Sequence, residues 1–228
     1  MKTTIFISGA FVSAFLLAGC DYGDPAVQAA QHGAGPQLPA PKNYLLPPMK
    51  VTEAGSWKPG EAPAVPAGLK ISALATGLVH PRFVYVLPDG DILIVESNGP
   101  KQPKNRPKDI IMGPIKAFGG SAQKGANRIT LVRPGGNGAA AQRTVFLDHL
   151  KSPFGVALVG SDLYVANADS LMRYHYTEGE TSITEAGTKV MDLPGAVGVL
   201  NHHWTKSLLA SADGSKLYVG VGSNSNIT

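Results

Sequence analysis

Cysteine is almost absent from this chain, which limits what can hold the fold together. The 228 residues include a single cysteine, Cys20, so no disulfide can form within one copy of the chain. Small secreted domains use disulfides where the hydrophobic core is too small to suffice. The folded part must therefore be stabilised by its core alone.

Sequence features of nucleic-acid and phosphate binding are missing as well. The formal net charge is only +4, and no basic run is interleaved with aromatic residues, so nucleic acid is not an expected partner. The densest basic stretch, Lys101–Lys108, contains two prolines and is typical of a solvated loop. Gly119–Gly125 lacks the spacing and the strand-to-helix setting of a phosphate-binding loop.

The N-terminal apolar run is too short to span a bilayer. Lys2 and the apolar stretch Ile5–Leu17 match the charged and hydrophobic regions of a secretory leader. The following Leu17-Ala18-Gly19-Cys20 matches a bacterial lipobox, in which the cysteine becomes the lipidated N-terminus. The sequence predicts a lipoprotein signal peptide over residues 1–19 and lipidation of Cys20. The alternative is an ordinary secretory signal with a chance cysteine.

The predicted anchor sets an expected location. A lipid on Cys20 would hold the protein at the membrane of a bacterial cell envelope, facing the periplasm. Asp21 resembles an inner-membrane retention signal and favours that membrane. Residues 20–68 contain many prolines with alanine and glycine between them, a composition that favours extended chain over a packed core. They are predicted to be a linker that holds the folded domain away from the membrane.

Three related strand–turn–strand units follow the linker. The first runs from Pro81 to Val95, the second from Pro153 to Ala166, and the third from His203 to Gly220. In the third unit, Asp213-Gly214 between two apolar runs is a hairpin signal, because glycine adopts positive φ without steric cost. Repeated all-strand units separated by turns indicate a propeller.

Further strands are predicted between the units. They lie at Arg128–Val132, Thr144–Leu147, Leu171–Tyr176 and Thr188–Leu193. Apolar and polar residues also alternate over Leu69–Leu74, which predicts an additional strand there. Ser97–Gly125 is too long and polar for a tight hairpin and is predicted to be a loop over one face. Almost no helix is expected outside the leader.

The predicted fold class is therefore all-β. Residues 69–228 are expected to form a β-propeller of four-stranded antiparallel blades. A blade takes about 40–50 residues, so the chain from Leu69 onward has room for roughly three blades. A propeller needs at least four blades to close its ring. The sequence is accordingly expected to be a truncated or partial form of a longer protein.

The third unit also carries a resemblance to a known family. His203-Trp204-Thr205-Lys206, an aliphatic pair, Asp-Gly, Lys-Leu-Tyr-Val and Val-Gly-Ser-Asn-Ser-Asn resemble the glucose/sorbosone dehydrogenases, which are β-propellers that use pyrroloquinoline quinone (PQQ). The resemblance runs from about Leu69 to Thr228 and is sharpest near the end. Relatives often have Asp before this histidine and Gly-Arg after it. Here His202 and Lys206-Ser207 stand at those places, which is closer to the sorbosone-type branch.

The resemblance implies a chemistry for particular residues. His203 would be the base that takes the proton of a substrate hydroxyl, while a sugar or similar alcohol passes hydride to PQQ and electrons leave to an external acceptor. His202, Lys206 and Arg82 are candidate cofactor-binding residues. Calcium is implied beside the quinone, with ligands expected beyond the end of this chain, so no metal ligand is assigned here.

Each assignment has a structural alternative. His203 could be a strand-end histidine packed beside Trp204, His202 could face solvent, and Lys206 could be a surface lysine. Arg82 is a candidate only because it begins the matching strand of the first unit. The alternative function is a non-catalytic propeller lipoprotein that binds a protein or a glycan.

Overall fold

The computed structural model describes residues 32–37, 52–55, 57–58, 60–100, 107–122, 124–136, 141–194 and 203–222. The predicted signal peptide, Cys20, Asp21 and His202 lie outside these residues. The chain divides into two compact units, Met1–Ala54 and Gly55–Thr228, and the description below concerns the second. Within the described ranges, no helix combines the length and apolar character that a membrane crossing requires.

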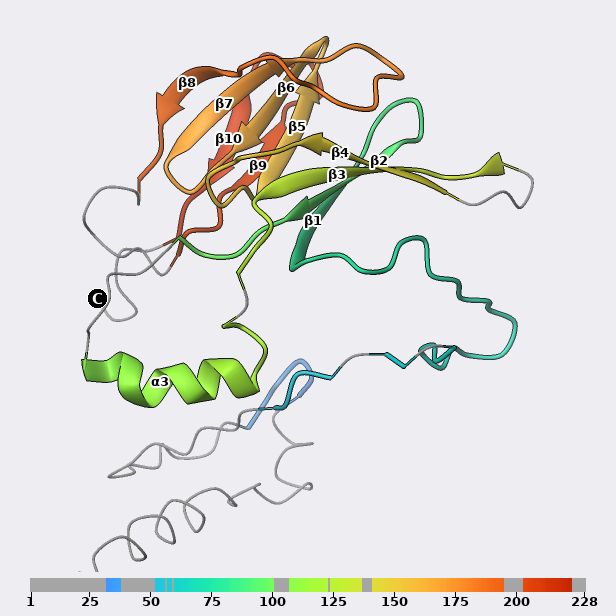
Figure 1. The fold of residues 1–228 in the computed structure, drawn as a ribbon, viewed down its shortest axis with the longest axis vertical. Coiled ribbons are helices and arrows are strands. Elements are labelled where there is room, and N and C mark those ends of the chain that lie inside the picture. Colours follow the sequence, from blue (N-terminus) through green and yellow to red (C-terminus); the bar gives the residue numbers. More distant parts are fainter. Residues whose placement is uncertain are drawn as a thin grey trace, which may run out of the picture. The chain divides into compact units, whose positions relative to one another are not determined.

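The second unit is built mostly from antiparallel strands (Figure 1). Each of two sheets has four strands that pair in chain order. Sheet 1 contains β1 (Pro81–Val86), β2 (Ile92–Glu96), β3 (Arg128–Arg133) and β4 (Gln142–Leu147). Sheet 2 contains β5 (Gly155–Val159), β6 (Asp162–Ala166), β7 (Ser170–His175) and β8 (Thr188–Asp192). The hairpin of β9 (Ser207–Ala210) and β10 (Leu217–Gly220) follows.

The three predicted strand–turn–strand units are confirmed as the first hairpin of each sheet and as β9–β10. A glycine with positive φ lies in each turn: Gly90, Gly160 and Gly214. In the third turn the N–H of Gly214 donates to the carbonyl of Ser211 at 2.9 Å. The four intervening strands are also confirmed, within one or two residues at their ends.

The hydrophobic core has two layers, one on each face of sheet 2. Between sheets 1 and 2 lie buried residues from both, among them Leu93, Leu131, Val156 and Val165. On the other face of sheet 2, Ala157 and Ala166 pack with Leu208 of β9. Successive residues of a strand point to opposite faces, so Val156 and Ala157 contribute to different layers. Sheet 2 is thus covered by sheet 1 on one side and by β9 on the other.

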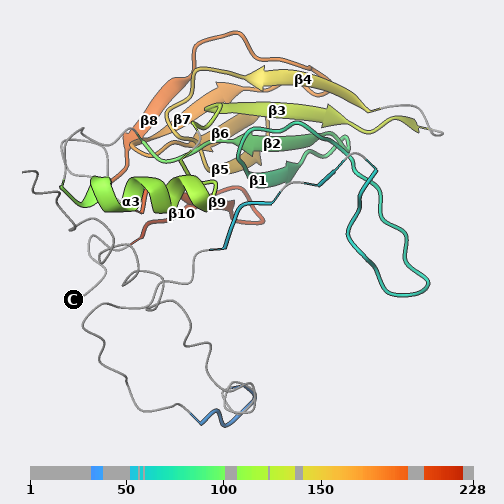
Figure 2. The ribbon, with the colours of Figure 1, turned by 60° about the horizontal axis from the view of Figure 1, so that its bottom comes forward.

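The sequence analysis predicted that the insertion between β2 and β3 is a loop, and this prediction is wrong for part of it. It contains α3 (Pro107–Phe118), which is drawn apart from the strands in Figure 1 and overlaps β9 and β10 in the view of Figure 2. Proline suits the first position of a helix because its missing N–H has no intrahelical partner there. The helix ends at Phe118, and Gly120, two residues later, has a φ of +69°. There Ser121 N–H donates to the Lys116 carbonyl at 2.9 Å, an arrangement that satisfies carbonyls of the last turn.

The prediction of a strand at Leu69–Leu74 is wrong. These residues form no strand, and Leu69, Ile71 and Leu74 are exposed. Their alternation therefore has no sheet to pair with in the described structure. The all-β prediction is confirmed at the level of two four-stranded antiparallel sheets with few helices, while the described residues form no closed barrel or propeller.

Candidate functional site

The starts of the three repeated units meet at one place in the structure. Phe83 of β1 and Phe154, just before β5, have ring centroids 5.8 Å apart. Phe154 in turn meets Trp204, just before β9, edge-on at 6.2 Å and 87°. The Arg82 guanidinium lies over the Trp204 ring, 5.5 Å from its centroid. A cation over an aromatic face is attracted by the ring electrons, so Arg82 is brought to the third unit although it is remote in sequence.

A buried carboxylate fixes the end of sheet 1 beside this aromatic row. Glu96 is 0 % exposed and forms an ion pair with Arg128, whose Nε lies 3.0 Å from Oε1. It also accepts hydrogen bonds from the Thr130 hydroxyl and from the backbone N–H of Val79. Burial alone would raise the pKa of Glu96, but these bonds outweigh burial and hold the pKa below its ordinary value. The next residue, Ser97, donates from Oγ to the Pro153 carbonyl at 2.5 Å and so links the first unit to the second.

The second and third units approach each other at backbone distance. The N–H of Gly155 donates to the carbonyl of Lys206 at 3.0 Å. A Cβ added at Gly155 would lie 2.5 Å from the backbone N of Leu208 and 2.6 Å from the Lys206 carbonyl oxygen. Glycine is therefore required at the first position of β5, because any side chain would displace the start of β9.

His203 lies in the short segment that leads into β9. A Cβ added at Gly222 would meet the Cβ of His203 at 2.5 Å and its Nδ1 at 3.2 Å, so the chain that leaves β10 packs against this imidazole. The neighbouring Trp204 is covered in part by Gly99, where an added Cβ would lie 2.9 Å from Nε1. His203 is thus packed against the segment that follows β10, and its neighbour Trp204 against the segment that follows β2.

Lys206 is not a surface lysine, which was the structural alternative. It is 0 % exposed, and its Nζ donates to the carbonyl oxygen of His203 at 2.8 Å. Burial lowers the pKa of this amino group, because a charge loses its hydration there. Among the ion pairs of the described residues, none includes Lys206.

The structure therefore brings together three of the four candidate residues. Arg82 touches the residue next to His203, and Lys206 is hydrogen-bonded to His203 itself. His202 lies outside the described residues. In the described part of the chain, no group of three or more His, Cys, Asp or Glu residues could hold a metal ion.

Several residues of this site were not predicted from the sequence. The sequence analysis assigned no functional role to Glu96 or to the aromatic residues Phe83, Phe154 and Trp204. One signal was present, since an aromatic residue stands near the start of the first strand in each unit. Only the packing of the units onto one another shows that these rings form a row.

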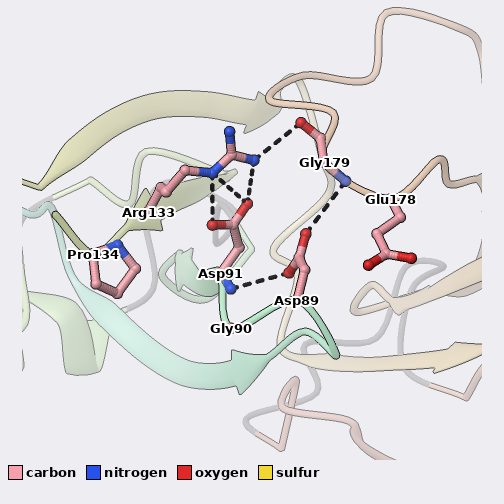
Figure 3. A pocket seen from close by; sticks show the side chains of 7 residues that line it. All are labelled: Asp89, Gly90, Asp91, Arg133, Pro134, Glu178 and Gly179. Carbon is pink, nitrogen blue, oxygen red and sulfur yellow. Dashed lines mark hydrogen bonds and ion pairs between the residues drawn. The ribbon is translucent and has the colours of Figure 1, made fainter. Parts of the chain in front are cut away.

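A polar hollow of about 800 Å³ lies at the β1–β2 turn (Figure 3). Arg133 binds Asp91 there, with Nη2 2.6 Å from Oδ2, and also donates to the Gly179 carbonyl at 3.0 Å. Asp89 accepts from the Gly179 N–H and from the Tyr176 hydroxyl, each at 3.3 Å. These bonds join the turn of sheet 1 to the segment after β7 of sheet 2.

Comparison with known proteins yields no relative: no family model, no curated protein and no solved structure matches this chain.

Proposed function

We propose that this protein is a PQQ-dependent oxidoreductase that oxidises an aldose, sorbosone or a similar alcohol. The observation that supports the proposal best is the meeting of the three unit starts through Phe83, Phe154 and Trp204, because it gathers a basic imidazole and two cationic side chains. Sheets that follow one another in chain order and pack face on face also suit an open portion of a β-propeller. The motif resemblance supplies the reaction class.

His203 would act as the general base. A neutral imidazole accepts a proton near neutral pH, and the segment that carries His203 is held by Lys206 and by the close contact at Gly222. PQQ, when bound, would supply the acceptor for the hydride that leaves the carbon bearing the hydroxyl. The proton of that hydroxyl would go to an imidazole nitrogen of His203, and the electrons would pass on to an external acceptor.

The residues at the site fit the quinone in part. PQQ carries carboxylate groups, and the exposed guanidinium of Arg82 could hold one by paired hydrogen bonds. Lys206 does not fit that role, because its amino group is enclosed and already donates to a backbone carbonyl. The described residues also offer no calcium site. Arg82 is therefore the cofactor-binding residue that we retain.

The decisive experiment is reconstitution. The protein is incubated with PQQ and calcium, and oxidation of glucose, sorbosone and simple alcohols is followed with an electron-accepting dye. We expect dye reduction that needs PQQ and a sugar. An absence of PQQ binding at micromolar concentration would reject the oxidoreductase proposal.

The alternative is a lipoprotein that binds a protein or a glycan without catalysis. The same reconstitution separates the two functions, because glycan binding without PQQ would support the alternative. In both cases we propose a bacterial envelope protein held by a lipid on Cys20, which mass spectrometry of the mature N-terminus would test.

A further inference from the structure

Lys206 is buried in a way that is unusual for a lysine. Lysine is rarely fully buried unless its charge is paired, yet Lys206 is 0 % exposed and stands among the largest fully buried side chains of the described structure. Within that structure its amino group donates to the backbone carbonyl of His203 at 2.8 Å. A methionine would fill a similar volume without burying an amino group, so the hydrogen bond is the feature that needs an explanation.

Lys206 is held at both its backbone and its side chain. Its carbonyl accepts from the Gly155 N–H at 3.0 Å, which fixes the residue to the start of β5. From that fixed point the side chain folds back across three residues to reach His203. The segment between them is not part of a strand and has no ladder of hydrogen bonds of its own. Lys206 therefore connects the position of His203 to the rigid sheet.

We propose that Lys206 is a positioning residue: by donating from Nζ to the carbonyl of His203, it fixes the backbone that carries this side chain, and it touches neither substrate nor quinone. This inference rests on the proposed function for its catalytic consequence, but the contact itself can be tested without activity. This role differs from the cofactor-binding role that the resemblance implies for Lys206.

The test compares two variants with one control. Lys206→Met keeps the volume but removes the donor, whereas Lys206→Gln keeps a neutral donor of slightly shorter reach. Lys216→Met changes an exposed lysine in the turn of the same hairpin. Folding of each variant is checked by circular dichroism and thermal unfolding. The imidazole resonances of His203, assigned from a His203→Gln spectrum, are then recorded by NMR.

We expect Lys206→Met to fold, to shift the His203 resonances, and to lower kcat by about 10²-fold, the usual cost of a misplaced catalytic group. In Lys206→Met, KM and PQQ affinity should stay within about twofold of the native values. Lys206→Gln should restore part of kcat, and Lys216→Met should change none of these quantities.

Two results would overturn the inference. One is weaker PQQ binding in Lys206→Met with unchanged His203 resonances, and the other is that both the resonances and kcat stay unchanged. Unfolding of both Lys206 variants would instead assign the residue to the fold alone. If the native protein oxidises no substrate, the proposed function fails while the NMR comparison still decides the positioning role.

Discussion

In the proposed mechanism the general base needs a fixed place as well as a basic nitrogen, and the backbone of His203 is held by the hydrogen bond from Lys206. We expect His203→Ala to lower turnover by about 10²–10⁴-fold, the contribution usual for a positioned base, with little change in PQQ binding. Dye-linked sugar oxidation measures turnover, and titration with PQQ measures binding. His175→Ala, at the exposed end of β7, is the matched control, and near-normal turnover of His203→Ala would leave His202 as the next candidate.

Glu96 affects stability at the same end of the molecule. Its folded-state pKa lies below the ordinary value of 4.5, because its hydrogen bonds outweigh burial. The stability that it contributes is therefore complete above pH 4.5 and is lost as the pH falls through the folded-state pKa. We expect Glu96→Gln to lower the free energy of unfolding at pH 7 by about 1–3 kcal/mol.

Urea denaturation across a pH series measures this effect. The difference between Glu96→Gln and the native protein should shrink below pH 4.5, the ordinary value for the carboxyl, since the native carboxylate is then being protonated. Glu185→Gln changes an exposed carboxylate and should have little effect at any pH. A difference that stays constant down to acid unfolding would show that Glu96 does not contribute through its charge.

Among the elements, the approach of β9 to β5 is the contact that forms the site. Gly155→Ala places a Cβ within 2.6 Å of backbone atoms of Lys206 and Leu208, and backbone cannot move aside as a side-chain end can. We expect a loss of about 1–3 kcal/mol in stability, typical of overpacking. Hydrogen exchange should speed up in β9 and β10 before it does in sheet 1. Gly136→Ala, where an added Cβ meets nothing within 4 Å, should leave exchange unchanged; equal protection in the two variants would refute the close contact.

The strands were predictable because the evidence for them is local. Alternating apolar residues and Asp-Gly or Gly-Ser turns determine a hairpin within about fifteen residues, and β5–β6 and β9–β10 were found in this way. The burial of Lys206 was not predictable, since it depends on where β9 docks against Gly155. The helix α3 was missed because its prolines and charges suggested a loop, although Pro107 and Gly119-Gly120 stand at the places where helices begin and end.

In the molecule as a whole, the two sheets are joined at both ends of their strands. At one end lies the aromatic row that ends at Trp204. At the other end, Arg133 and Asp89 of sheet 1 bind the segment around Gly179 of sheet 2 (Figure 3). The apolar layer between the two sheets and the links at both ends resist the sliding of one sheet over the other. A site made from the starts of three different units requires such a fixed arrangement.

Tyr176 reports on this junction between the sheets. It follows β7 of sheet 2, and its hydroxyl donates to Asp89 in the β1–β2 turn of sheet 1. Burial, followed by the negative charge of Asp89, raises the pKa of Tyr176 from 10.0 to about 12. As the pH rises, the hydroxyl of Tyr176 therefore ionises in the unfolded chain before it ionises in the folded protein. The stability that Tyr176 contributes is complete below pH 10.0 and is lost between pH 10.0 and about 12.

We therefore expect the free energy of unfolding to fall over this range, with roughly 2–3 kcal/mol of the loss coming from Tyr176. Denaturation at several alkaline pH values, with tyrosinate absorbance followed in parallel, measures the loss. In Tyr176→Phe the loss should be smaller by that amount, because the titrating hydroxyl is gone. Tyr218→Phe, at a tyrosine that is 54 % exposed, should behave like the native protein. If Tyr176→Phe loses stability as steeply as the native protein, the hydroxyl is ionised as easily as in water, and the two sheets do not meet at Asp89 in solution.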